Sequence, residues 1–141
     1  WTMADSGAAL TWWNKTTTSV IGSGTHQENS GAMIYTGSTE RRYQVQANGS
    51  YATVFWGAED ANVKSYFMGK SGSVGMMKNT WNGSVIVYVD GVSLGTFNLY
   101  SEQTPVRQTV NFSLAWSGLH TFKVIGASAW AGGNFDCLIV A

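Results

Sequence analysis

Short apolar runs separated by polar and glycine-rich segments recur along the whole chain. In several runs, apolar and polar side chains alternate. At residues 108–114, for example, Val110, Phe112 and Leu114 share one face and polar side chains occupy the other. This period of two is typical of a β-strand with one buried face. The pattern predicts an all-β chain, an antiparallel β-sandwich or jelly roll of about 8–10 strands.

Residues 84–125 carry the clearest strand and turn signals of the chain. The run at residues 84–89 is apolar on both faces, because three valines alternate with two other apolar residues: Val85, Val87 and Val89 with Ile86 and Tyr88. A strand with two apolar faces is expected inside a sandwich rather than at an edge. Asp90 and Gly91 then predict a tight turn into a second strand at residues 92–100.

The remaining elements follow from the same pattern. Strands are expected at residues 9–13, 32–36, 43–47, 51–56, 63–68 and 135–140, and around Phe122 and Val124. Asn48 and Gly49 favour a type I′ turn. The segment at residues 69–75, rich in Gly and Ser, is predicted to be a loop, as are residues 126–134.

The composition supports an all-β domain and limits the kinds of ligand that the chain is expected to bind. The chain has 141 residues with 17 Gly, one Pro and seven Trp, which favours strands and turns and one domain over residues 1–141. It opens on Trp1, so we expect a piece excised from a longer protein. The formal net charge is zero and no basic stripe is present, which disfavours nucleic acid and suits a neutral ligand such as a sugar. No apolar run reaches the ~20 residues of a membrane span.

Four segments of the second half carry a family resemblance: VIVYVDG at 85–91, FNLYS at 97–101, QTVNF at 108–112 and GLHTFKV at 118–124. They resemble the framework of galactose-binding-like jelly rolls, a group that includes many carbohydrate-binding modules. The likeness covers roughly residues 80–141. It implies sugar binding through loop aromatics and, in many members, a structural calcium. Such domains are appended to glycoside hydrolases, and similar sandwiches cap phage tail fibres and tailspikes.

Two tryptophans stand beside amides in predicted loops. Trp81 lies between Asn79 and Asn82, and Trp130 precedes Asn134. Sugars offer flat C–H faces that pack on aromatic rings and hydroxyl groups that bond amides, so a sugar site needs both types of residue. The alternative is that each ring folds over the end of the sandwich or packs against a neighbouring chain.

Metal-binding and catalytic signals are weak by comparison. Asp136, on the expected closing strand, either bonds backbone groups or, as the resemblance implies, helps to hold calcium; no other cofactor is expected. Glu59 and Asp60 are adjacent, whereas a glycosidase needs two carboxylates facing each other across a gap of ~5–10 Å. His120 is expected to be structural. No nucleophile elbow, phosphate loop or zinc motif is present.

The sequence therefore predicts a non-catalytic glycan-binding domain of an extracellular or virion protein, which recognises a cell-surface polysaccharide. One alternative is an oligomerisation domain, such as the end of a homotrimeric phage tail fibre or tailspike used in host attachment. A second alternative is a catalytic domain that degrades polysaccharide. Insertion into a membrane is not expected.

Overall fold

The computed structural model describes residues 19–56, 61–102, 106–127 and 132–141, and these residues form strands almost throughout. The strands are β1 (Val20–Ile21), β2 (Gly24–Gln27), β3 (Ile34–Thr36), β4 (Ser38–Tyr43), β5 (Tyr51–Trp56), β6 (Asn62–Lys78), β7 (Ser84–Val89), β8 (Val92–Asn98), β9 (Val106–Gly126), β10 (Gly133–Phe135) and β11 (Cys137–Val140). A single 3-10 turn, η1 (Asn48–Ser50), completes the elements of the described segments. The prediction of an all-β fold is confirmed.

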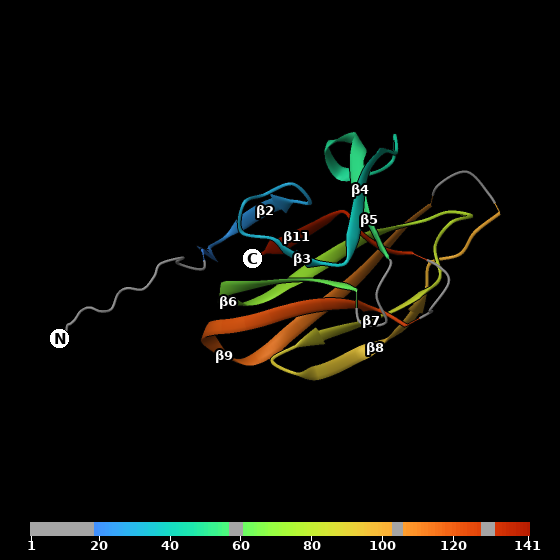
Figure 1. The fold of residues 1–141 in the computed structure, drawn as a ribbon. Helices are drawn as coiled ribbons and strands as arrows, with labels where there is room; N and C mark the ends of the chain where they lie inside the picture. Colours follow the sequence, from blue (N-terminus) through green and yellow to red (C-terminus); the bar gives the residue numbers. More distant parts are fainter. Residues whose placement is uncertain (1–18, 57–60, 103–105, 128–131) are drawn as a thin grey trace.

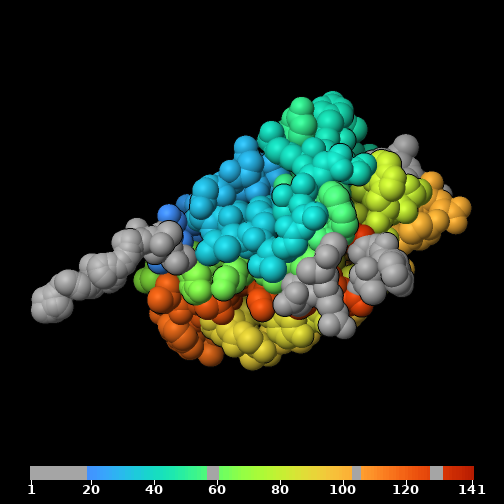
Figure 2. Space-filling view, viewed as in Figure 1, coloured from blue at the N-terminus to red at the C-terminus, as the bar shows by residue number. Residues whose placement is uncertain are grey.

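The strands form two sheets. The larger sheet has the order β2-β11-β6-β9-β7-β8, with β1 and β3 added along β6, and the smaller has the order β10-β5-β4. β1 pairs with β6 in parallel, and the other paired strands of the described segments run antiparallel. In Figure 1, β4 and β5 rise above the layer of β6, β9, β7 and β8. Figure 2 shows residues 19–56 covering one side of the molecule, with β8 along the opposite side.

The aromatic core lies between these layers. The rings of Phe67 and Phe112 have centroids 5.5 Å apart, and those of Phe122 and Phe135 are 5.6 Å apart. All four rings are buried, and Val85, Val87 and Val89 of β7 join them. β7 pairs with β8 on one side and β9 on the other, so its predicted position away from the sheet edge is confirmed.

The long strands β6 and β9 were predicted as shorter pieces. They pair from end to end except at a register shift between Gly69 and Ser71, where residues 114–117 of β9 have no partner in β6. The prediction of a loop at residues 69–75 is wrong, because β6 continues through them. Gly72 shows the reason: a Cβ there would lie 2.0 Å from the Ile139 carbonyl oxygen and 2.9 Å from the Phe112 ring. Glycine in this strand permits close approach of β11 rather than ending the strand.

Turn chemistry explains two further outcomes. Asp90 (φ 52°) and Gly91 (φ 77°) both take positive φ, as a type I′ turn requires, so the predicted hairpin is confirmed. The prediction of a strand at 43–47 is wrong, since β4 ends at Tyr43. The chain then turns, with the Ala47 N–H donating to the Gln44 carbonyl (2.8 Å) and the Gln44 N–H to the Ser50 carbonyl (2.8 Å).

The last predicted strand is divided in the structure. Asp136 separates β10, which belongs to the smaller sheet, from β11, which belongs to the larger sheet. The strand predicted at 9–13 lies outside the described residues. Within the described part of the chain no helix is long and apolar enough to cross a membrane.

Candidate functional site

Trp81 lies in the connection between β6 and β7 and keeps 54% of its surface exposed. The Arg42 guanidinium, from β4, sits over the indole with its carbon 4.5 Å from the ring centroid. A cation over a Trp face is attracted by the ring quadrupole, by about 0.5–1 kcal/mol at an exposed site. The contact holds the ring against β4 while leaving much of it open to solvent.

Backbone bonds fix the connection that carries this ring. The Trp81 N–H donates to Asn79 Oδ1 (2.9 Å), which closes an Asx turn. The Gly132 N–H donates to the Trp81 carbonyl (3.1 Å), and the Gly83 N–H donates to the Gly132 carbonyl (2.9 Å). The connection is therefore tied to the residue that precedes β10.

The three asparagines predicted beside the rings are buried. Asn79, Asn82 and Asn134 are 3%, 2% and 0% exposed. Asn82 Nδ2 donates to the Met77 carbonyl (2.7 Å), and Asn134 Oδ1 accepts the Met77 N–H (2.8 Å). These amides hold the backbone at the end of β6 instead of facing solvent. In the structure they support the Trp81 connection, and hydrogen bonds from Asn79, Asn82 and Asn134 to a ligand stay a prediction.

Trp130, the second predicted ring, lies outside the described residues. The described chain resumes at Gly132, whose N–H bonds the Trp81 carbonyl. Gly132 also forms a β-bridge with Asn82. Gly132 is therefore bonded to the Trp81 connection, and a contact of Trp130 with ligand stays a prediction.

The hairpin of β4 and β5 adds Arg42 to the site, a contact that the sequence did not predict, and carries a separate group of aromatic and basic side chains around Tyr51. Tyr43 and Tyr51 are register partners and their rings meet edge to face at 5.6 Å. The Arg41 guanidinium carbon lies 4.1 Å from the Tyr51 ring centroid. Tyr43 is 65% exposed. The sequence signal for these two contacts was the adjacent pair Arg41 and Arg42, because neighbouring side chains of a strand point to opposite faces.

The residues around Asp136 do not fit a calcium ion. Its buried carboxylate accepts from Arg107 Nη1 and, through Oδ2, from the Asn48 N–H (2.9 Å). Burial raises the pKa of Asp136, while the Asn48 N–H and the Arg107 guanidinium lower it in part. Calcium takes six to eight oxygen ligands, and a guanidinium on the same oxygen opposes it. The described residues hold no group of three or more His, Cys, Asp or Glu that could bind a metal ion. Structural hydrogen bonding, the first of the two interpretations of Asp136, is favoured.

His120 belongs to the framework. Its ring is buried; Nδ1 contacts Asp90 Oδ2, and Nε2 lies 3.1 Å from the Trp116 carbonyl oxygen. Burial opposes ionisation of Asp90, but the Thr121 N–H and the His120 ring outweigh it and lower the pKa of Asp90. Trp116 is 55% exposed, with its ring centroid 4.1 Å from that of His120. These contacts close the turn between β7 and β8 onto β9.

Proteins of known structure share this arrangement of strands. No family model and no curated protein matches the sequence. Solved structures match in shape. A family 35 carbohydrate-binding module from an environmental isolate has a TM-score of 0.63 and 17% identity over 83% of this chain and 91% of its own. The chain has the jelly-roll fold of this module.

Two further structures agree. The family 35 module of Cellvibrio japonicus Abf62 has a TM-score of 0.61 and 20% identity over 83% of this chain and 92% of its own. A family two carbohydrate esterase from Cellvibrio japonicus has a TM-score of 0.61 and 18% identity over 82% of this chain, which spans 32% of the esterase. The expected jelly roll is confirmed. Sequence identities this low support a shared fold and no more.

Proposed function

We propose that this chain is a non-catalytic carbohydrate-binding domain that holds a glycan on the exposed ring of Trp81. One observation carries the proposal: a half-exposed indole is fixed by Arg42 and by backbone bonds at a loop of a carbohydrate-binding-module fold. The flat C–H face of a sugar packs on such a ring, and Arg42 donates to its hydroxyl groups. A ring held in place loses little entropy when it binds.

The acidic side chains support binding rather than hydrolysis. Four of the described carboxylates have cationic or imidazole partners: Glu28 with Arg41, Glu40 with Arg42, Asp90 with His120 and Asp136 with Arg107. Hydrolysis of a glycosidic bond uses two carboxylates facing each other across the bond. Carboxylates held in structural pairs are poorly suited to that work.

The proposal extends to where the domain acts. A domain with no net charge and an exposed aromatic ring suits attachment to a cell-surface polysaccharide. We place it on an extracellular or virion protein, as a receptor-binding unit of the kind that phage tail fibres use for host attachment. Its partner is a glycan rather than a nucleic acid or a membrane.

Affinity electrophoresis through gels containing soluble polysaccharides tests the proposed function. We expect at least one polysaccharide to retard the chain, with no release of reducing ends after prolonged incubation. Retardation by none of a broad panel would contradict glycan binding. Release of reducing ends would instead support the catalytic alternative.

A second candidate function, assembly of a homotrimer, is favoured by one observation. Met68 and Leu119 are register partners on β6 and β9, and they are 49% and 51% exposed. Paired exposed apolar side chains are common where chains meet. Sedimentation velocity decides this candidate. It predicts a trimer that becomes a monomer with Met68→Asp and Leu119→Asp together, whereas a monomeric wild-type chain would exclude it.

A further inference from the structure

A groove crosses the outer face of β6, β9 and β7, away from the Trp81 connection. Its volume is about 430 Å³, within the range of about 300–1,000 Å³ common for ligand pockets. It is lined from the beginning of β6, whereas Trp81 follows the end of that strand. The groove is therefore a second place on the molecule where a ligand of sugar size can lie.

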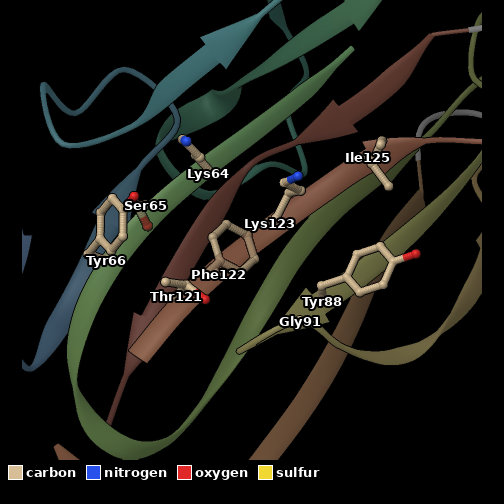
Figure 3. A pocket seen from close by; sticks show the side chains of 9 residues that line it. All are labelled: Lys64, Ser65, Tyr66, Tyr88, Gly91, Thr121, Phe122, Lys123 and Ile125. Atoms are coloured by element: carbon tan, nitrogen blue, oxygen red, sulfur yellow. The ribbon is translucent and has the colours of Figure 1, made fainter. Parts of the chain in front are cut away.

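Two aromatic rings flank this groove. Figure 3 shows Tyr66 and Tyr88 on opposite sides, with Lys64 and Lys123 between them. Both tyrosines are half-buried, so their rings are held by the sheet while keeping open surface. Two phenol rings on either side of the groove offer stacking surfaces and hydroxyl groups to a sugar chain.

The two lysines are the unusual part of the groove. Lys64 and Lys123 are register partners on β6 and β9, so their side chains leave the sheet side by side. Like charges directly opposite on paired strands destabilise a sheet. The described residues provide neither lysine with an ion pair, although Arg41, Arg42 and Arg107 all have one. Two positive charges thus share the groove without a counter-charge from the described chain.

We propose that this groove binds an acidic glycan, a polysaccharide that carries carboxylate or sulfate groups. An acidic group between the two ammonium groups accepts charge-assisted hydrogen bonds from both and removes their repulsion. The adjoining sugar rings pack on Tyr66 and Tyr88. The inference rests on the proposed function for the class of ligand, but it concerns a different site and adds selectivity for negative charge.

The surroundings favour a glycan over a nucleic acid. Nucleic-acid binding draws its affinity from many phosphate contacts along a basic stripe. Here the positive charge is confined to two lysines, and the chain has no formal net charge. A single pair of ammonium groups suits one acidic group of a sugar chain.

Calorimetric titration of the full chain with polygalacturonate and with its methyl ester tests the inference, since the two polymers share a backbone and differ in charge. We expect the acid to bind at least about tenfold more tightly than the ester. Lys64→Gln with Lys123→Gln should abolish this preference. Dextran sulfate against dextran shows whether sulfate serves as well as carboxylate.

Three controls keep the result interpretable. Lys70→Gln removes an exposed lysine outside the groove and should leave the preference intact. The double lysine variant should melt no lower than the wild-type chain, because it removes a like-charge pair. Trp81→Ala should weaken binding of both polymers alike, so failure of the Trp81 site and failure of the groove give different patterns.

Several outcomes would overturn the proposal. They are equal binding of acid and ester, binding of neither, a preference that survives loss of both lysines, and an equal loss with Lys70→Gln. A lower melting temperature of the double variant would also count against it. Single-stranded DNA that binds as tightly as polygalacturonate would point to a nucleic-acid site instead.

Discussion

Replacing Arg107 with alanine is expected to lower the free energy of unfolding by about 3 kcal/mol, the loss typical when one partner of a buried ion pair is removed. Asp136 is fully buried, and its charge is balanced by Arg107. In the variant only the Asn48 N–H would remain on the charged oxygen. Gly75 leaves the space that Arg107 occupies, since a Cβ there would lie 2.5 Å from Nη2. Chemical denaturation measures the change.

The loss of stability in the Arg107→Ala variant should depend on pH in a defined direction. Burial already raises the pKa of Asp136, and removing Arg107 raises it further. A carboxyl group whose pKa is higher in the folded protein stabilises the fold fully below the unfolded value, and loses that contribution as pH rises through the folded value. The deficit of the variant should therefore be larger at about pH 7 than at about pH 4.

An exposed ion pair provides the control. Glu40 and Arg42 pair at 3.0 Å with side chains 51% and 31% exposed. Glu40→Gln should therefore cost less than about 1 kcal/mol. A loss below about 1 kcal/mol with Arg107→Ala, or a deficit that grows as pH falls, would contradict the assigned role of the Arg107 pair.

The hairpin of β7 and β8 could be predicted from sequence because its determinants are local. Alternating apolar residues define the strand, and Asp90 and Gly91 supply the positive φ that the turn requires. The same local reasoning failed at residues 69–75. Glycine there looks like a loop signal, yet Gly72 is needed because Ile139 and Phe112, distant in sequence, press against it.

The candidate site also has features that the sequence predicts and features that it does not. A ring between two amides marked Trp81 as a loop aromatic, and the structure shows it exposed. Burial of the amides could not be predicted, because the contact that buries Asn134 is with the Met77 backbone in another strand. The groove was missed for a similar reason: Lys64 and Lys123 become neighbours only through the register of β6 with β9.

Trp81→Ala is expected to weaken glycan binding by about thirtyfold, or about 2 kcal/mol, the size of effect found for hot-spot aromatic residues. The ring supplies the apolar surface of the site, while the backbone bonds of its connection do not involve the side chain. The variant should therefore keep its fold. Trp116 is the matched control, since it has the same exposure but stacks on His120, away from this connection.

Calorimetric titration of the wild-type chain, Trp81→Ala and Trp116→Ala with a polysaccharide that retards the wild type tests the central claim most directly. We predict that Trp81→Ala loses about thirtyfold in affinity while Trp116→Ala changes it less than about threefold. Equal affinity of all three proteins, or a larger loss with Trp116→Ala, would contradict glycan binding at Trp81.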